Sequence, residues 1–255
     1  MVKTTLSAVM IVKNEESKIE SCLRSLSWVD EIVVLDSGSN DSTVEICEKY
    51  TKNVYVENVW HGFGVQRQLA ESYASGDWIF AVDADEEVTE ELAEEIQAVV
   101  EANERDKVYA VPRLTWAFGS FVRHSGWYPD YVVRLYPRKR AHYNDSVVHE
   151  RVVFGSDMRI QYLKNDLLHY SYNNLESWIS KSARYSALWA EEKHKKGVRC
   201  SFYDSITHSI MFFLRVYVVK KGFLDGAAGF MVASTGAFSR FLKYSDLWLR
   251  QKNRD

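Results

Sequence analysis

Hydrophobic residues in the first hundred positions form short runs that are separated by amphipathic stretches. The apolar runs predict four strands, at Leu6–Val12, Glu31–Leu35, Val54–Val59 and Trp78–Val82. The stretches between them carry apolar residues three and four positions apart, which is the spacing of a buried helix face. They predict four helices, at Ser17–Trp28, Thr43–Tyr50 and Val65–Tyr73, and after a capping Thr89.

Strands that alternate with helices of about ten residues are typical of βαβ units and of a parallel sheet. We therefore predict an α/β fold with a Rossmann-like, mostly parallel sheet flanked by helices. Acidic residues follow three of the strands, namely Glu15, Asp36 and the pair Asp83 and Asp85. Because parallel strands end at one edge of a sheet, we expect these carboxylates at the edge where open α/β sheets bind ligands.

The Asp83-Ala84-Asp85 segment is the first candidate for chemistry. On an extended backbone, residues two positions apart project to the same face. Carboxylate oxygens suit Mg²⁺ or Mn²⁺, and these ions often take substrate phosphates as further ligands. The segment thus predicts a metal–diphosphate site. An acidic turn that caps the next helix is the alternative, since Asp-x-Asp is a short and common pattern. The acidic residues after the other strands favour the metal site.

Beyond Lys107 the chain becomes richer in aromatic residues, and its last part is predicted to be helical. Strands are predicted at Val108–Pro112 and near Arg159–Leu163, and a helix at Leu175–Lys193. We expect a catalytic domain at residues 1–170, whose acceptor side is formed by about 108–170. A helical extension follows at residues 171–255.

The extension is basic and contains a largely apolar run, His208–Val219, followed by Lys220 and Lys221. Residues 188–255 hold 12 Lys and Arg against 6 Asp and Glu, although the whole chain has a net charge of −3. No apolar stretch reaches the roughly 20 residues that span a bilayer. Two interpretations stay open: amphipathic helices on an anionic membrane surface, or a helical lid packed on the main domain or at a homodimer interface.

Composition narrows the function class further. The net charge of −3 over 255 residues argues against a general nucleic-acid binder. Cys22, Cys47 and Cys200 are far apart, so we expect neither a disulfide framework nor a cysteine metal site. This usage, and an N-terminal sequence unlike a signal peptide, predict a reducing, cytoplasmic location.

Three segments carry a resemblance to a known family: Val12–Glu16, Asp36–Thr43 and Asp83–Glu86. Their order and spacing resemble family 2 glycosyltransferases with the GT-A fold, over residues 6 to about 105. Later segments look like the lipopolysaccharide-core β-1,4-glucosyltransferases of the WaaE/KdtX type. These later segments are Gly126–Asp130, Arg134-Leu135, residues 148–150 and Gly222–Gly226.

The resemblance implies a nucleotide-sugar donor, a divalent metal and inversion at the anomeric carbon. Contacts to the nucleotide sugar are implied for Asn14, Glu15, Asp36, Gly38, Arg67 and Asp83. Asp85 is the implied metal ligand, with Asp83 meeting the metal through the ribose or a water. Because imidazole is an acceptable Mn²⁺ ligand, His149 or His169 is a candidate to complete the metal's ligands, and a histidine that is simply hydrogen-bonded is the alternative for each. Acceptor contacts are expected from Trp127, Tyr128 and Arg134.

An inverting transfer also needs a carboxylate that takes the acceptor proton. The Glu-Asp pair followed by Arg-Trp that marks this base in many relatives is absent here. Glu150, which follows a β-branched run, and Asp130, which follows a Trp-Tyr-Pro turn, are the candidates, with Glu150 slightly ahead. The alternative for each is a structural salt bridge, with Arg134 or Arg151 as partner.

The resemblance thus implies transfer of glucose from UDP-glucose to a heptose of the lipopolysaccharide inner core, with a β-1,4 linkage. The enzyme would work at the cytoplasmic face of the bacterial inner membrane. Two alternatives stay open: transfer to another acceptor, such as a peptide or a different glycan, and a non-catalytic module that binds nucleotide sugars.

Overall fold

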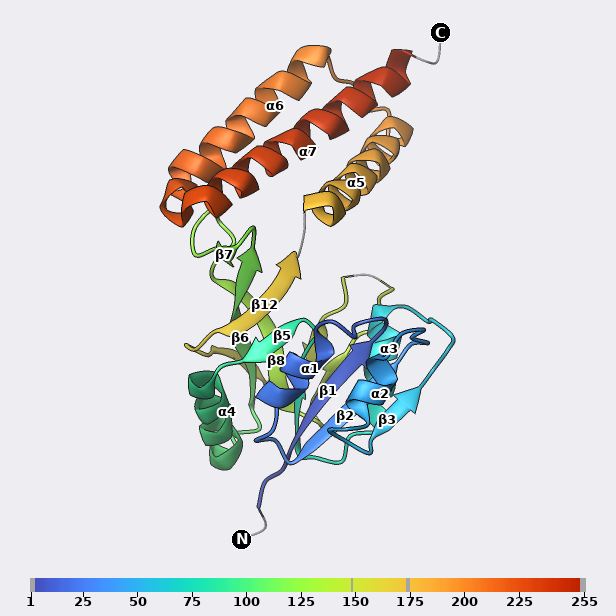
Figure 1. The fold of residues 1–255 in the computed structure, drawn as a ribbon, viewed down its shortest axis with the longest axis vertical. Coiled ribbons are helices and arrows are strands. Elements are labelled where there is room, and N and C mark those ends of the chain that lie inside the picture. The colour runs from blue at the N-terminus through green and yellow to red at the C-terminus, as the bar shows by residue number, and fades with distance from the viewer. Residues whose placement is uncertain (1–2, 148, 173–174, 253–255) are drawn as a thin grey trace. The chain divides into compact units, whose positions relative to one another are not determined.

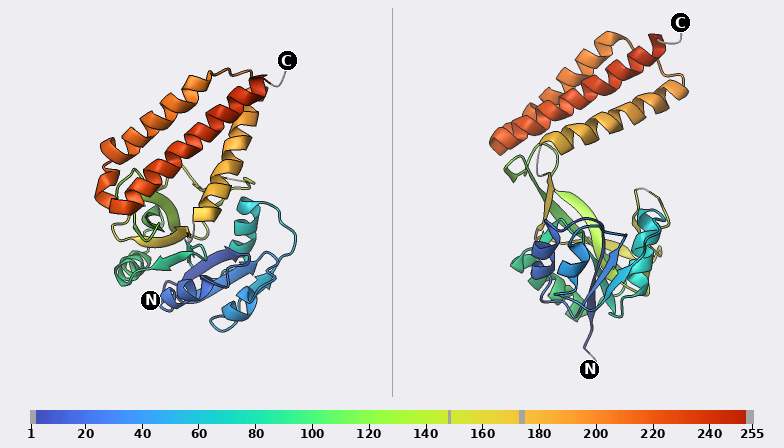
Figure 2. Two further views of the ribbon diagram at one scale, coloured as in Figure 1. Left: turned by 45° about the horizontal axis from the view of Figure 1, so that its top comes forward. Right: turned by 45° about the vertical axis from the view of Figure 1, so that its right-hand side comes forward.

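The computed structural model describes residues 3–147, 149–172 and 175–252, which divide into two compact units (Figures 1 and 2). The first unit consists of Met1–Arg113 and Asp130–His169, and the second of Leu114–Pro129 and Tyr170–Asp255. Segment Leu114–Pro129 therefore groups with the C-terminal helices, whereas the sequence prediction placed it on the acceptor side of the catalytic domain.

A parallel four-stranded core forms the centre of the first unit. Its strands lie in the order β3 (Val54–Val56), β2 (Glu31–Asp36), β1 (Leu6–Val12) and β4 (Trp78–Ala81), and all neighbours are parallel. The sheet continues through strands that the first hundred residues do not supply. Antiparallel β8 (Asp130–Pro137) pairs with β4 and with β6 (Lys107–Ala117).

Shorter strands complete the β structure of this unit. Two of them, β5 (Glu86–Val88) and β12 (Leu167–Tyr172), pair antiparallel. Two more, β9 (Ala141–Tyr143) and β10 (Val152–Phe154), form a separate antiparallel pair. The predicted strand near Arg159–Leu163 is β11 (Arg159–Tyr162), which runs parallel to β6. The short β5, directly after the Asp83–Asp85 segment, was not predicted.

The four predicted helices of the first unit are present, with somewhat different ends. They are α1 (Ile19–Ser25), α2 (Thr43–Cys47), α3 (Phe63–Ser72) and α4 (Glu90–Ala102). Thr89 caps α4 as expected, because its hydroxyl accepts a hydrogen bond from the Leu92 N–H at 3.2 Å.

Side chains alternate between two hydrophobic clusters along the central strands. In β1, Met10 and Val12 belong to a cluster with helices α1 and α4, whereas Val9 packs in a second cluster with Ala70 of α3. The sheet is therefore covered on both faces, which explains the nearly continuous apolar runs of its strands.

The second unit is built around three long helices, α5 (Leu175–Lys195), α6 (Phe202–Leu214) and α7 (Gly226–Lys252). Helix α7 packs against both α5 and α6. A π-helical turn, Arg215–Val219, and a 3₁₀ turn, Gly222–Asp225, join α6 to α7. The hairpin strand β7 (Ser120–Phe121) pairs with the end of β6. Within the described residues, no helix has the length and apolarity needed to cross a membrane.

Asp225 explains the Gly222–Gly226 motif. Its buried carboxylate accepts hydrogen bonds from the His124 N–H at 3.0 Å and from the Ser125 hydroxyl at 3.1 Å. A Cβ on Gly229 would lie 1.8 Å from the carbonyl oxygen of Gly222, so only glycine fits there. The motif thus joins the 123–125 segment to the start of α7. The elements are those of the predicted α/β fold, a sheet flanked by helices with a C-terminal helical extension.

Candidate active site

The polar loops after β1 and β2 lie at the same edge of the parallel sheet and are joined by hydrogen bonds. The side-chain oxygen of Asn14 accepts the Asn40 N–H at 2.8 Å, and the Asn14 N–H donates to the Ser39 hydroxyl at 2.8 Å. The Glu15 N–H donates to the Thr43 hydroxyl at 2.8 Å. The two loops therefore form one fixed surface at the carboxyl ends of the strands.

Asp36 holds the second of these loops in shape. Its carboxylate accepts the N–H groups of Gly38 at 2.8 Å and Ser39 at 2.9 Å, and its side chain is buried. Gly38 has a φ of +84°, which glycine adopts readily. Asp36, which was predicted to contact the uridine, therefore also fixes the shape of this loop.

Asp83, at the tip of β4, lies between two buried arginines. One carboxylate oxygen accepts a hydrogen bond from Arg67 of α3 at 2.6 Å, and the other accepts one from Arg134 of β8. Arg134 also donates to Glu86 at 2.6 Å, and Glu86 is fully buried. Two carboxylates and two guanidinium groups thus form the centre of a network beneath the sheet edge.

The network shifts the proton equilibria of its two acids in opposite directions. Burial raises the pKa of Asp83, but Arg134 and Arg67 outweigh burial and hold that pKa well below its usual range. Burial raises the pKa of Glu86 above its ordinary value, and Arg134 offsets this only in part. Asp83 is therefore the permanently ionised member of the network.

Asp85 points to different partners, because the backbone turns between the two aspartates. The Glu86 N–H donates to the Asp83 carbonyl at 3.0 Å, which closes a turn over Ala84. Our expectation that an extended backbone would project both side chains to one face is therefore wrong. An Asp85 oxygen lies 3.5 Å from Nε2 of His169 in β12 and 3.8 Å from Nζ of Lys18. Burial raises the pKa of Asp85, but the hydrogen bond and charge of His169 outweigh it, so the net shift is downward.

The residues at this edge offer a divalent metal a carboxylate at Asp83 and another at Asp85. Each Asp83 oxygen already accepts a hydrogen bond from an arginine, which favours Asp85 as the ligand. Asp85 and His169 offer a carboxylate oxygen and an imidazole nitrogen close together. Among the described residues, no three His, Cys, Asp or Glu side chains gather into a complete metal site. A bound ion would therefore need further ligands from water or from a diphosphate.

His149, the other predicted metal ligand, is placed differently from His169. It is exposed, has a φ of +60° and lies in the irregular segment between β9 and β10. Of the two histidines, His169 is the one that the structure places within 4 Å of Asp85.

The two candidate bases are both ion-paired, with arginines other than the predicted Arg134 or Arg151. An oxygen of Glu150 lies 3.3 Å from Nε of Arg67, and an oxygen of Asp130 lies 2.6 Å from Nη2 of Arg113. Glu150 was expected at the end of a strand, but it lies in the loop that precedes β10. Part of the predicted run, Val148, lies outside the described residues.

The predicted acceptor residues fall in two places. Arg134 was expected to contact the acceptor, but it is 2% exposed and its guanidinium bonds to Asp83 and Glu86, so it is a structural partner of the site. Trp127 and Tyr128 belong to the second unit, where the Trp127 ring packs 5.6 Å from that of Trp178 and Arg123 lies over the Tyr128 ring at 5.5 Å.

Sequence reasoning missed several members of the site. Glu86 was quoted only as part of a motif, and Arg113 and Tyr143 were not singled out. Arg113 lies 3.6 Å from Glu86, and Arg67 stacks over the Tyr143 ring at 4.9 Å from its centroid. The sequence contained one signal for these residues, namely Glu86, which follows Asp83 and Asp85. A further carboxylate at the end of a buried strand requires a cation nearby.

The family model for glycosyl transferase family 2 matches residues 7–163, which include the members of this site other than His169. The chain belongs to glycosyl transferase family 2. It is 32% identical to an uncharacterised glycosyltransferase of Rickettsia felis over 97% of this chain and 92% of that protein. It is 31% identical to LpsC of Rhizobium meliloti, a lipopolysaccharide core biosynthesis glycosyltransferase, over 97% of this chain and 93% of that protein.

Solved structures of other proteins also align with this family 2 chain. TarS of S. aureus, residues 1–349, covers 99% of this chain and 92% of its own, at 17% identity and a TM-score of 0.47. Glucosyl-3-phosphoglycerate synthase of Mycobacterium tuberculosis, solved with Mn²⁺ and UDP-glucose, covers 45% of each chain at 26% identity and a TM-score of 0.37.

The buried network gives a prediction about stability. Replacing Arg134 with Met should lower the free energy of unfolding by about 3–5 kcal/mol, because Asp83 and Glu86 would be left buried without their shared cation. Chemical denaturation monitored by circular dichroism measures this change. The control is Arg159→Met, which removes an exposed pair with Asp106 and should leave unfolding unchanged. Equal stability of the two variants would show that the network does not support the fold.

Proposed function

We propose that this family 2 enzyme transfers glucose from UDP-glucose to a heptose of the lipopolysaccharide inner core, with inversion and a β-1,4 linkage. The observation that supports transfer most directly is the paired Asp85 and His169 at the carboxyl edge of a parallel sheet. The match to LpsC, whose name assigns it to lipopolysaccharide core biosynthesis, supports the acceptor class.

In this proposal the joined loops after β1 and β2 bind the nucleotide. Asn14, Glu15 and the Gly38 backbone line the edge, while Asp36 keeps the loop in shape. Arg67 would face the diphosphate side of the site, since it lies in the first turns of α3 and bonds to Asp83 at 2.6 Å. Its second carboxylate partner, Glu150, limits the directions in which its guanidinium can point.

A divalent ion, Mg²⁺ or Mn²⁺, would be held by Asp85 and His169. When bound there, it would stabilise the negative charge that develops on the leaving diphosphate. Lys18, 3.8 Å from Asp85, contributes a positive charge at the same place. Asp83 would act indirectly, by fixing Arg67 and the turn that presents Asp85.

The transfer step is a single displacement. The acceptor hydroxyl oxygen bonds to the anomeric carbon of glucose as the bond from that carbon to the phosphate oxygen of UDP breaks. The hydroxyl proton passes to a carboxylate. We favour Glu150 as this base, because Arg67 connects it to the tip of β4, and Asp130, paired with Arg113, is the second candidate.

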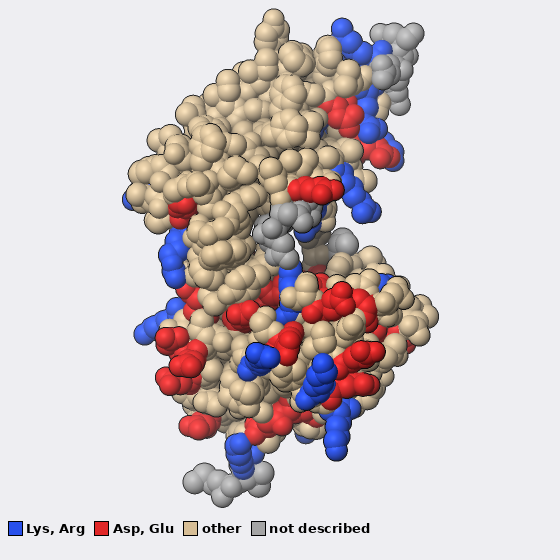
Figure 3. Space-filling view, in the orientation of Figure 1, with Lys and Arg blue, Asp and Glu red and all other residues tan. Residues whose placement is uncertain are grey.

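We also propose that the enzyme works at the cytoplasmic face of the inner membrane and docks there through α6 and the turns that follow it. Large apolar side chains along this segment are exposed, including Met211 at 65% and Val219 at 71%. The sequence from Ser205 to Leu224 contains no acidic residue, whereas Arg215, Lys220 and Lys221 are basic. Figure 3 shows that the surface over α6 carries few charged side chains. Apolar insertion with flanking cations suits an anionic lipid surface, and a homodimer interface is the alternative occupant of this face.

The enzymatic proposal is tested with UDP-glucose and a heptose-terminated core oligosaccharide. We expect Mn²⁺-dependent release of UDP and a β-1,4-glucosylated product, identified by NMR. Asp85→Asn should lower kcat/KM by about 100-fold or more, as expected for a group that supports charge stabilisation in the transition state. Asp106→Asn, which changes an exposed carboxylate, is the control and should retain full activity.

The outcome of this experiment shows which part of the proposal is wrong: the metal role, the acceptor or catalysis itself. Full activity of Asp85→Asn, or of the wild type in EDTA, would reject the metal role while leaving transfer intact. Transfer to a peptide or to another glycan, with none to the heptose, would reject the acceptor. UDP-glucose binding without turnover on any acceptor would favour the non-catalytic module.

The membrane proposal predicts co-sedimentation with phosphatidylglycerol vesicles that ~0.5 M salt only partly reverses, since salt screens charges but not apolar insertion. Lys220→Gln with Lys221→Gln should weaken this binding and leave UDP affinity unchanged. Lys195→Gln with Lys196→Gln, which removes two charges already paired to Glu191 and Glu192, is the matched control. Failure to bind any vesicle, together with a dimeric mass in light scattering, would assign the face to a second copy.

A further inference from the structure

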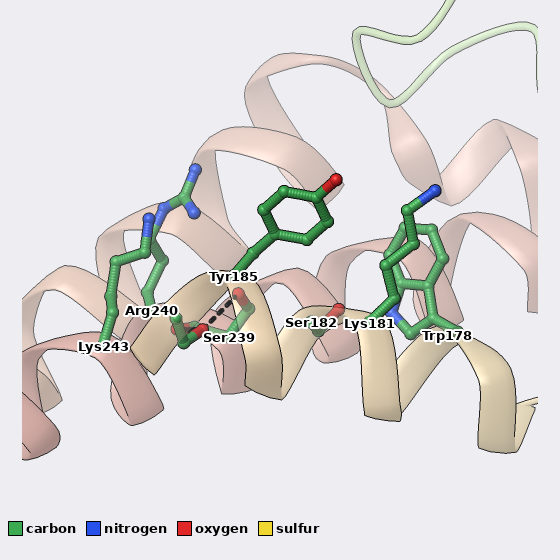
Figure 4. Close-up of a pocket in the computed structure, with 8 residues that line it drawn as sticks. Trp178, Lys181, Ser182, Tyr185, Ser239, Arg240 and Lys243 are labelled. Carbon is green, nitrogen blue, oxygen red and sulfur yellow. Dashed lines mark hydrogen bonds between the residues drawn. The ribbon is translucent and has the colours of Figure 1, made fainter. Parts of the chain in front are cut away.

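A groove between α5 and α7 in the second unit lies outside every site described so far. Its cavity volume is about 310 Å³, near the lower end of the roughly 300–1,000 Å³ that small-molecule sites occupy. Helix α5 contributes aromatic, basic and hydroxyl side chains, and α7 contributes a hydroxyl and two cations. The lining residues are Trp178, Lys181, Ser182, Tyr185, Ser186, Ser239, Arg240 and Lys243 (Figure 4).

The lining holds three cations and no carboxylate. Figure 4 shows Arg240 and Lys243 together at one end, Lys181 near the other end, and the Tyr185 ring between them. Within the described part of the chain, neither Arg240 nor Lys243 forms an ion pair with an acid. Each lies over an aromatic ring instead: Arg240 over Phe212 at 4.5 Å, and Lys243 over Trp189 at 4.9 Å from the ring centroid. The rings hold both cations in place without neutralising their charge.

The crowding of positive charge is unfavourable in the absence of an anion. Burial lowers the pKa of Lys243, and the nearby charge of Arg240 lowers it further. An anion in the groove would relieve both effects. Phosphate suits the lining best, because Arg and Lys donate charge-assisted hydrogen bonds to its oxygens and serine hydroxyls can add further donors.

The aromatic side chains add a second element of recognition. Tyr185 is 62% exposed, although its ring lies among the lining residues. An exposed aromatic ring beside a phosphate site offers an apolar face and a polar hydroxyl to a sugar ring. The Ser186 hydroxyl, which lies 3.2 Å from that of Ser239, links α5 to α7 at the floor of the groove. We propose that this groove binds a phosphate-bearing saccharide, its phosphate beside Arg240 and Lys243 and its sugar ring against Tyr185, on the side of the groove that leads to Lys181.

The proposal does not require the transfer activity and is tested by binding alone. Isothermal titration of the full-length protein with glucose 6-phosphate should give saturable binding, stronger than that of inorganic phosphate and at least about tenfold stronger than that of glucose. Arg240→Gln with Lys243→Gln should reduce the affinity for glucose 6-phosphate by about tenfold or more, since two charge-assisted contacts are lost. Lys252→Gln is the matched control: it removes a cation from the same helix that also lies over a ring, Trp248 at 4.9 Å, and should bind like the wild type.

A second variant keeps the test decisive if the double substitution disturbs folding. Tyr185→Ser changes an exposed side chain, so it should fold normally, and it should weaken glucose 6-phosphate binding while leaving inorganic phosphate binding unchanged. Equal affinity of the wild type and both groove variants would overturn the proposal. So would binding of phosphatidylglycerol vesicles through Arg240 and Lys243 without any binding of glucose 6-phosphate, because that result would assign the groove to a lipid headgroup.

Discussion

The sharing of two buried arginines among three carboxylates is the interaction on which the candidate site depends. Arg134 bonds to both Asp83 and Glu86, and Arg67 bonds to Asp83 and lies beside Glu150. Burying carboxylates at the end of a hydrophobic strand is costly unless cations compensate them. Here the cations come from α3 and β8, so helix α3, the tip of β4 and an antiparallel strand are held together where the parallel strands end.

Because of these ion pairs, the two aspartates of the Asp83–Asp85 segment have different partners. Both carboxylate oxygens of Asp83 bond to arginines, and the backbone turn over Ala84, closed by the Glu86 N–H, directs Asp85 toward Lys18 and His169. In the proposed mechanism, the first aspartate would have a positioning role and the second would be the metal ligand. The loop after β2 is fixed in a similar manner, because the Asp36 carboxylate accepts hydrogen bonds from the backbone of that loop.

The local pattern of apolar residues was sufficient to predict the parallel strands and their helices. It also predicted that the acidic residues after these strands lie at one edge of the sheet. Strand β1 and the apolar face of α1 follow from their spacing, because burial on both faces of a sheet and on one face of a helix leaves a periodic signature. The partners of the acids leave no such signature. Arg134 lies 51 residues from Asp83 in the chain and meets it only because β8 pairs antiparallel with β4. Likewise, Leu114–Pro129 joins the helical unit through contacts such as that of Asp225 with His124.

The central claim is that Asp85 with His169, and not Asp83, meets the metal of a UDP-sugar site. Anomalous diffraction from crystals grown with Mn²⁺ and UDP tests it most directly. The account predicts a Mn²⁺ peak about 2.0–2.3 Å from an Asp85 oxygen, as for hard cations on oxygen ligands, with His169 as a second protein ligand and Asp83 still bonded to its two arginines. A Mn²⁺ ion bound by Asp83, or UDP bound at another place with no metal at this edge, would contradict it.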